Sequence, residues 1–166
     1  MRARYLVYST IVLYLMFAAF ATAGKKADRY VPYRPDGALK PVTVIIQYDN
    51  PDLPPERRER MAKRMRIAIE VTTEKAAISR GEKTAELSTE DYLKLWKLFR
   101  KVNVWELDEN ALTTPRPLGV PTRIFSLKME GAGEKFFNVN TPNSRSKKHF
   151  KVIKFIEELC AEYALP

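Results

Sequence analysis

The clearest hydrophobic pattern in the chain lies between Leu87 and Leu107. Ser88 is a good N-cap because its hydroxyl can accept from the free N–H groups of a first turn, and Asp91 follows at the capping-box position. From there apolar residues recur every three or four positions, the spacing of one helical face. These residues are Tyr92, Leu95, Trp96, Phe99 and Val102. The pattern predicts an amphipathic helix whose stripe must be buried against the rest of the chain.

Segments with the two-residue period of β-strands lie on both sides of this helix. Residues 66–71 and 123–129 alternate apolar and polar positions, which is typical of antiparallel strands buried on one face. Residues 42–48 form a near-continuous apolar run, which predicts a strand covered on both faces or nearly so. The other predicted strands are residues 76–79, 83–86 and 134–140.

The C-terminal segment returns to the helical period, with Val152, Ile156, Leu159 and Tyr163 on one face. We therefore predict an α+β domain: an antiparallel sheet of four to six strands with two helices packed on one face, in the order β-β-α-β-β-α. This single domain is predicted to span residues 42–166. An irregular leader, rich in proline, is predicted to precede it at residues 24–41.

Residues 1–23 are predicted to be a signal peptide. Arg2 and Arg4 precede the apolar run Tyr5–Phe20, and Ala21-Thr22-Ala23 fits the small-x-small pattern of a cleavage site. The alternative is an uncleaved membrane anchor, for which the run is short, because a span needs about 20 apolar residues. We therefore expect a secreted or periplasmic protein, cut after Ala23 and without a transmembrane span once the segment is removed.

The net charge and the cysteine content limit the possible partners and show whether disulfides can stabilise the fold. The net charge of +9 falls to +7 when Arg2 and Arg4 leave with the signal segment. A basic exported protein can bind anionic lipid, cell-wall polymer or acidic protein, whereas export argues against nucleic acid as a partner. The alternative, which the composition favours, is that the charge serves solubility. The single cysteine, Cys160, rules out an internal disulfide, so the fold must depend on apolar burial. Cys160 lies on the apolar face of the last predicted helix, which predicts a buried and inert thiol.

The segment 56–66 is dense in basic residues and follows Pro55, which suits the first position of a short helix. Both a short basic helix and a polar connection fit the pattern. The functional interpretation is an anion-binding patch formed by Arg57, Arg58, Arg60, Lys63 and Arg64. The alternative, which the pattern favours, is a solvated face, because no aromatic residue is interleaved to stack on a base or a sugar.

No residue pattern indicates catalysis. His149 is the only histidine and, following Lys147 and Lys148, is predicted to lie on the surface at a helix start. The sequence contains no HExxH, CxxC or G-x-S-x-G pattern, so we expect a non-enzymatic protein without a metal or cofactor. Two acidic clusters lack the spacing of a calcium loop and are explained by turn formation and a solvated loop start. They are Asp49-Asn50 with Asp52, and Glu106 with Asp108-Glu109.

The order of the predicted elements resembles a group of small exported bacterial domains of unknown function. In outline it is also similar to the emfourin-type protein inhibitors of thermolysin-like metalloproteases. The resemblance covers about residues 43–163, and its specific part is Leu87-Ser88-Thr89-Glu90 and Trp105-Glu106-Leu107. Those residues are structural, so the resemblance implies no inhibitory residue. The basic segment 56–66 and the proline-rich loop after residue 107 depart from it.

Three functions follow from this sequence as hypotheses. The favoured one is an exported, non-enzymatic binding or structural module whose partner is another exported protein or an anionic envelope component. The second is a proteinaceous inhibitor of a secreted metalloprotease, acting by insertion of the loop Thr113–Pro121 into an active-site cleft. The third is binding of an envelope polyanion or an anionic membrane through the basic segment 56–66.

Overall fold

The structure, a computed structural model, describes residues 29–165. The described residues from Pro32 onward form one compact unit, and the description below concerns that unit alone. The predicted signal peptide and its cleavage site lie outside the described residues. In chain order the elements are β1 (Val42–Asp49), α2 (Pro55–Met65), β2 (Ile67–Val71), β3 (Ala76–Arg80), β4 (Lys83–Glu86), α3 (Thr89–Val102), the 3-10 turn η1 (Val104–Glu106), β5 (Thr122–Met129), β6 (Gly133–Val139) and α4 (Lys147–Glu162).

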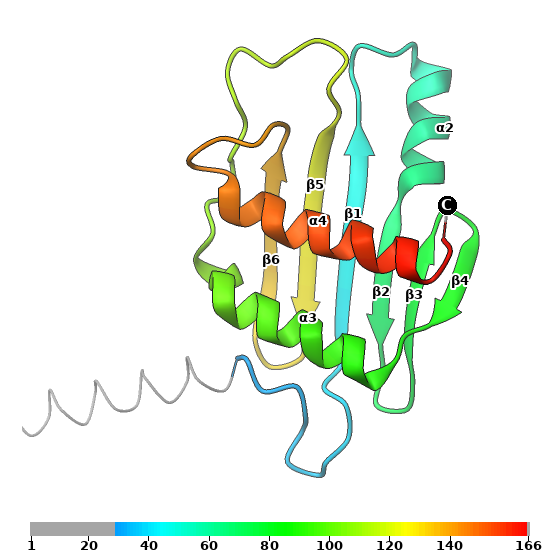
Figure 1. The fold of residues 1–166 in the computed structure, drawn as a ribbon, viewed down its shortest axis with the longest axis vertical. Coiled ribbons are helices and arrows are strands. Elements are labelled where there is room, and N and C mark those ends of the chain that lie inside the picture. The colour runs from blue at the N-terminus through cyan, green and yellow to red at the C-terminus, as the bar shows by residue number, and fades with distance from the viewer. Residues whose placement is uncertain (1–28, 166) are drawn as a thin grey trace, which may run out of the picture. The chain divides into compact units, whose positions relative to one another are not determined.

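The strands form one six-stranded antiparallel sheet in the order β4-β3-β2-β1-β5-β6, with β1 at its centre (Figure 1). The predicted α+β class is therefore confirmed. The element order differs from the predicted one in two respects. Helix α2 separates β1 from β2, and four strands precede α3 where the predicted order had two, although the strand segments predicted individually at residues 42–48, 66–71, 76–79 and 83–86 did place four strands there. The sequence pattern of residues 55–65 allowed either a helix or a polar connection, and the segment is helical.

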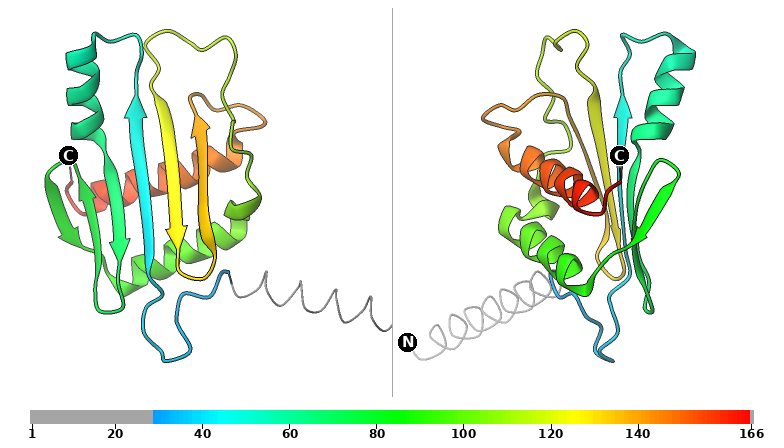
Figure 2. Two further views of the ribbon diagram at one scale, coloured as in Figure 1. Left: turned by 180° about the vertical axis from the view of Figure 1, so that it is seen from behind. Right: turned by 45° about the vertical axis from the view of Figure 1, so that its right-hand side comes forward.

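Helices α3 and α4 lie over one face of the sheet (Figures 1 and 2). The predicted stripe of α3 is buried: Tyr92, Leu95 and Phe99 are 0% exposed, Trp96 2% and Val102 3%. The predicted N-cap is also present, because the Ser88 hydroxyl accepts from the Asp91 backbone N–H at 3.1 Å. This helix was predictable because its cap, period and stripe are all local features of the sequence.

The core between the helices and the sheet is built on a stack of aromatic rings. The rings of Phe125 in β5 and Phe137 in β6 stack with centroids 4.5 Å apart, and Phe99 meets Phe125 edge-on at 6.3 Å. His149 joins this group, edge-on to Phe137 at 4.7 Å, and only 2% of it is exposed. The predicted surface position of His149 was wrong, because the residue shares the buried face of α4 with Val152 and Ile153.

The opposite face of the sheet is not covered by α3 or α4 (Figure 2). On β1, Val44 and Ile46 are buried under the helix layer, whereas Ile45 is half-buried and Gln47 is exposed. The prediction that this strand is covered on both faces or nearly so was therefore wrong, since Gln47 is exposed and Ile45 only half-buried. A continuous apolar run reports the composition of a strand, but it does not determine whether a second layer packs on the other side.

The segment before β1 is held against the start of α3. Residues Tyr33 and Leu39 form an isolated antiparallel bridge, and the buried Tyr92 hydroxyl lies 2.8 Å from the Pro32 carbonyl oxygen and 2.9 Å from that of Lys40. Burial raises the pKa of Tyr92 to about 12, so the phenol remains a donor at neutral pH. The compact unit thus begins at Pro32, before the predicted domain start at residue 42.

An acid-dependent contribution to stability is expected at the N-terminus of α3. The Asp91 carboxylate accepts from the Lys94 ammonium, the Ser88 hydroxyl and the Tyr163 hydroxyl, each at 2.8 Å, and these bonds lower its pKa to about 2. The carboxyl group has a lower pKa in the folded protein than in the unfolded chain, so its ionised form stabilises the fold at every pH above the unfolded-state pKa. This stabilisation is lost as the pH falls toward 2 and the carboxylate becomes protonated. We expect Asp91→Asn to lower the free energy of unfolding by about 1 kcal/mol at pH 7 and to flatten its decline in acid.

Urea unfolding followed at a series of acid pH values measures this effect. Glu90→Gln is the matched control, because Glu90 pairs with the same lysine but its side chain is 80% exposed. If the free energy of unfolding declined equally with falling pH in the Asp91→Asn variant and in the unmodified protein, the assignment would be contradicted.

Candidate anion-binding site

Helix α2 is an insertion between two adjacent strands. Strands β1 and β2 are antiparallel neighbours, with Ile46 opposite Ile67, and a two-residue hairpin is enough to join such a pair. Instead, residues 50–66 form a turn and then α2, which begins with Pro55 at its first helical position. None of the residues of α2 is fully buried. Burial in the core therefore does not explain the sequence of this helix.

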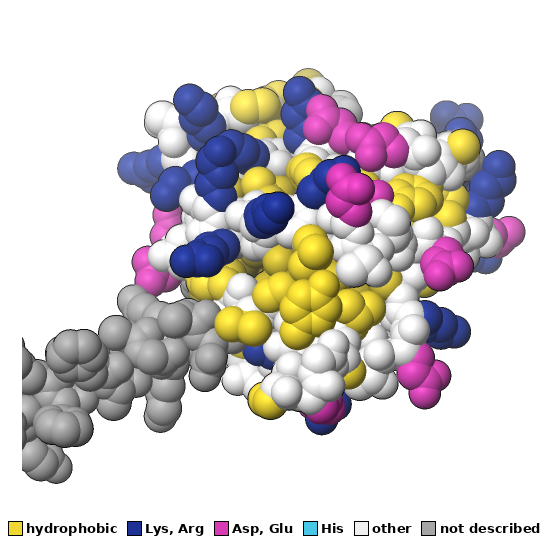
Figure 3. Space-filling model, turned by 60° about the horizontal axis from the view of Figure 1, so that its bottom comes forward, with side chains coloured by type: hydrophobic (Ala, Val, Ile, Leu, Met, Phe, Trp, Pro, Cys, Tyr) yellow, Lys and Arg dark blue, Asp and Glu magenta, His cyan; other side chains and the backbone are white. Residues whose placement is uncertain are grey.

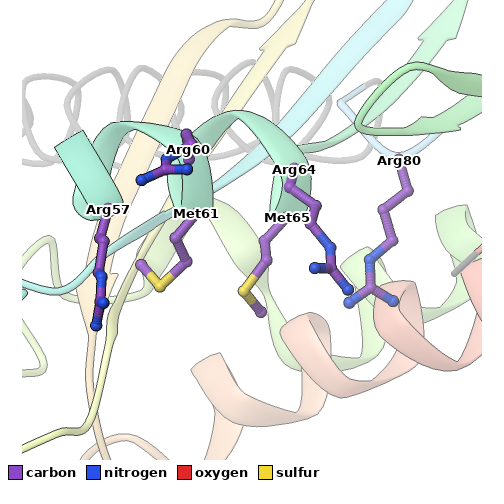
Figure 4. Close-up of a pocket in the computed structure, with 6 residues that line it drawn as sticks. All are labelled: Arg57, Arg60, Met61, Arg64, Met65 and Arg80. Atoms are coloured by element: carbon purple, nitrogen blue, oxygen red, sulfur yellow. The ribbon is translucent and has the colours of Figure 1, made fainter.

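One side of α2 forms a hollow of about 480 Å³ together with the end of β3 (Figure 4). Three of the five predicted anion-binding residues line it. The lining residues are Arg57, Arg60, Met61, Arg64 and Met65 from α2, and Arg80 from β3. The three helix arginines come together because positions 57, 60 and 64 follow the spacing of one helical face. We call this feature the arginine hollow.

The other two predicted residues, Arg58 and Lys63, lie on a different side of α2 and line another hollow together with Arg66 and Ile124. Each is paired with an acid. The Arg58 guanidinium forms a bidentate pair with Asp49, with one N–O distance of 2.8 Å, and the Lys63 ammonium lies 3.3 Å from the Glu82 carboxylate. The predicted patch is thus divided into an unpaired group and a paired group.

Arg80 completes the arginine hollow and was missed by the sequence analysis, whose predicted strand ended at residue 79. Its guanidinium lies beside that of Arg64 in Figure 4, and its Nε atom is buried without a hydrogen-bond partner among the described residues. A signal was present: Arg80 stands two residues after Ile78, so strand alternation puts both on the helix-facing side. A donor of this kind is available to solvent or to the acceptor oxygen of a bound anion.

Gly81 sets the distance between Arg80 and α2. Its backbone N–H donates to the Arg66 carbonyl oxygen at 2.9 Å, and a Cβ atom at this position would lie 2.9 Å from the Arg64 carbonyl oxygen. Its φ angle of +59° also falls in the left-handed region that favours glycine. The turn between β3 and β4 can therefore pack directly on the end of α2, which brings Arg80 next to Arg64.

The arginine hollow is strongly positive. Within residues 29–165, none of its four guanidinium groups lies within 4.0 Å of a carboxylate. The nearest polar contact of Arg60 is to the Glu56 backbone carbonyl at 3.4 Å. Guanidinium groups are always charged and present donors in a fixed fork that matches carboxylate and phosphate oxygens. The arrangement can therefore bind an anion, and its residues offer no nucleophile or general base.

The other candidate residues have structural roles. Asp52 accepts from the Gly119 backbone N–H at 2.7 Å and pairs with Arg116, while Asn50 forms a local turn by accepting from the Asp52 N–H. In the part of the chain that the structure describes, no three His, Cys, Asp or Glu side chains form a group that could hold a metal ion. Cys160 is buried, as predicted, and burial raises its pKa to about 11, so the thiol is protonated at neutral pH.

The loop Thr113–Pro121 is attached to the domain at both ends. Asn140 forms three hydrogen bonds to backbone groups, two of them to Thr113, and Asp52 holds Gly119. Between these attachments Leu118 is 87% exposed, the most exposed large apolar side chain among the described residues. The loop therefore presents one apolar side chain on a fixed backbone.

Comparison with known proteins gave no relative. No family model matches the chain, and no curated protein is similar to it in sequence. Across residues 29–165, no helix has the length and apolar character that crossing a membrane requires. The function must therefore be argued from the site itself.

Proposed function

We propose that this protein is an exported, non-enzymatic binding module and that the arginine hollow binds phosphate or carboxylate groups of an anionic envelope component. The observation that supports this function is the convergence of Arg57, Arg60, Arg64 and Arg80 on one hollow without a carboxylate partner in the described residues. Surface arginines that serve only solubility need not converge from two separate elements. Here the close contact between Gly81 and the Arg64 backbone allows Arg80 of β3 to approach α2.

The composition of the hollow favours a small ligand with several anionic oxygens. Four guanidinium forks suit bidentate contacts to such oxygens, and each charge-assisted bond is stronger than a neutral one. A volume of about 480 Å³ lies in the usual range of ligand pockets. Met61 and Met65 add flexible apolar surface between the arginines, which suits an anionic group carried on a partly apolar body.

The proposal also includes export of the protein, which is inferred from the sequence of residues 1–23. A signal segment followed by removal after Ala23 places the domain in the periplasm or outside the cell. In that compartment the anionic partners are envelope polymers, lipids and exported proteins, and nucleic acid is not among them. The absence of any recognisable catalytic pattern in the sequence supports a binding role rather than an enzymatic one.

Titration of the purified chain with tripolyphosphate, followed by calorimetry, tests this function. We expect the triple variant R57Q/R60Q/R64Q to bind this probe about 100-fold more weakly, because three charge-assisted contacts are lost. The matched control is R58Q/K63Q/R66Q, which removes the same charge from residues that line the other hollow and should change the affinity less than about threefold. Equal losses in the two variants would mean that net charge, and not the hollow, attracts the anion.

A second candidate function is inhibition of a secreted metalloprotease, which the exposure of Leu118 on an attached loop supports. A fixed backbone lowers the entropy cost of inserting such a loop into a cleft. Incubation of the protein with secreted metalloproteases tests this candidate, with Leu118→Asp as the control variant. Full protease activity at an excess of the protein would remove inhibition from consideration.

A further inference from the structure

A second basic surface, separate from the arginine hollow, lies at one end of the helix layer. Helices α3 and α4 run in opposite directions, because His149 at the start of α4 contacts the Asp108 carbonyl beyond α3, and Tyr163 after α4 contacts Asp91. Exposed basic side chains therefore lie at the same end of the helix layer, where α3 ends and α4 begins. They are Lys97, Arg100, Lys101, Lys147, Lys148 and Lys151. We call them the helix-end cluster; Figure 3 shows Lys and Arg side chains gathered at this side, at its upper left.

None of these six side chains lies within 4.0 Å of a carboxylate among residues 29–165. The same two helices do form ion pairs further along their length. Lys94 pairs with Glu90 and Asp91, and Lys154 pairs with Glu158. Asp108 and Glu109 follow α3 closely in sequence, but among residues 29–165 neither carboxylate lies within 4.0 Å of a basic side chain of the cluster. Unpaired positive charge is thus concentrated at one end of the helix layer.

Helix stability does not explain this distribution on α4. The partial positive charge at a helix N-terminus favours acidic residues in the first turn and basic residues in the last. The first turn of α4 carries Lys147 and Lys148 and no acid, while its last turn has no basic residue. The acids of α4 stand instead in its second half, at Glu157, Glu158 and Glu162. The charged side chains at both ends of α4 are therefore unfavourably placed relative to the helix dipole. At the N-terminus, the partial positive charge of the helix adds to the positive potential of Lys147 and Lys148.

The residue types of the cluster indicate what kind of anion it suits. Five of the six are lysines, whose ammonium groups are hydrated point charges on flexible stems, whereas the arginine hollow uses rigid forks. In the described part of the chain, none of the exposed large apolar side chains lies on α3 or α4. Such a surface can attract a broad, hydrated anionic layer without inserting into it. The headgroup layer of a bilayer that contains anionic phospholipid has these properties.

We propose that the helix-end cluster docks the domain on an anionic phospholipid bilayer by electrostatic attraction, without insertion and independently of the arginine hollow. Each basic residue near such a surface raises partitioning about fivefold, and the attraction falls off within a Debye length of about 10 Å at 0.1 M salt. Binding is therefore expected to be strong at low ionic strength and to be lost at high ionic strength. The orientation places α3 and α4 toward the lipid and leaves the opposite sheet face toward solution.

Partitioning of the full chain onto vesicles tests this proposal. The readout is the ratio of binding to vesicles of phosphatidylglycerol with phosphatidylcholine over binding to phosphatidylcholine alone. This ratio cancels any contribution of the N-terminal apolar segment. We expect the variant K147Q/K148Q/K151Q to lower the ratio about 100-fold at low salt. The matched control K75Q/K83Q/K128Q removes the same charge elsewhere and should lower it less than about tenfold, whereas K147R/K148R/K151R should retain it.

Three outcomes would overturn the proposal. Equal losses in the test and control variants would show that net charge alone drives the interaction. Equal binding of the unmodified chain to both vesicle types would show that anionic lipid is not the ligand. Binding to polyglutamate without a preference for anionic vesicles would indicate an acidic protein as the partner. Because R57Q/R60Q/R64Q should retain the vesicle ratio and K147Q/K148Q/K151Q should retain tripolyphosphate binding, failure of this proposal is distinguishable from failure of the arginine hollow.

Discussion

Phe125→Ala is expected to lower the free energy of unfolding by about 3–5 kcal/mol, a loss comparable to the whole stability of a marginal domain. Phe125 is 0% exposed and lies on a strand paired with both β1 and β6. Its ring stacks on Phe137 at 4.5 Å and meets Phe99 of α3 edge-on, so it joins the sheet to the helix layer. Truncation removes this packing and leaves a cavity that close-packed neighbours cannot fill.

Urea unfolding monitored by circular dichroism measures this loss as a lower midpoint with an unchanged slope. Phe136→Ala is the matched control, because Phe136 is the neighbour of Phe137 on β6 but points to the open face and is 50% exposed. We expect it to cost less than about 1 kcal/mol. Similar losses for the two variants would contradict the central position of Phe125 in the core.

Asn140→Ala is expected to lower the free energy of unfolding by about 2–3 kcal/mol and to loosen the start of the loop Thr113–Pro121. Asn140 is 1% exposed, and its carboxamide oxygen accepts from the backbone N–H groups of Thr113 and Thr141, both at 2.8 Å. Its amide donates to the Thr113 carbonyl oxygen at 3.2 Å. Alanine leaves these groups without their partner, which costs more than the bonds contribute when formed.

Hydrogen exchange at the Thr113 amide reports the local effect, and urea unfolding reports the global one. Asn110→Ala is the control, since Asn110 is exposed and its side chain accepts one bond, from the Leu112 N–H at 3.2 Å. That change should cost less than about 0.5 kcal/mol. Unaltered protection of the Thr113 amide in the Asn140→Ala variant would show that the loop is held by other contacts.

The parts of the fold that were predictable are those encoded in neighbouring residues. The buried stripe of α3 was predictable from its helical period alone, and the half-buried strands were predictable from their alternation of apolar and polar residues. His149 was misplaced because the adjacent Lys147 and Lys148 suggested a solvated helix start, although its spacing from Val152 put it on the buried face. The open face of β1 was missed because coverage depends on a layer supplied by distant segments.

The candidate site was predictable only in part for the same reason. Helical spacing groups Arg57, Arg60 and Arg64, but the pairing of Arg58 with Asp49 requires the end of β1 to lie beside α2. The contribution of Arg80 requires a turn to pack on the helix, which the sequence shows only as the presence of Gly81. Partners that are separated along the chain follow from topology rather than from local pattern.

The insertion of α2 also has an evolutionary consequence. A helix without a fully buried side chain can gain, lose or reorder exposed charged residues with little effect on folding. The sheet and the helices α3 and α4 can keep their sequence while the inserted helix changes. Substitutions at the exposed positions of residues 55–65 can therefore change the charge on this side of the domain while the sheet and the helix layer stay as they are.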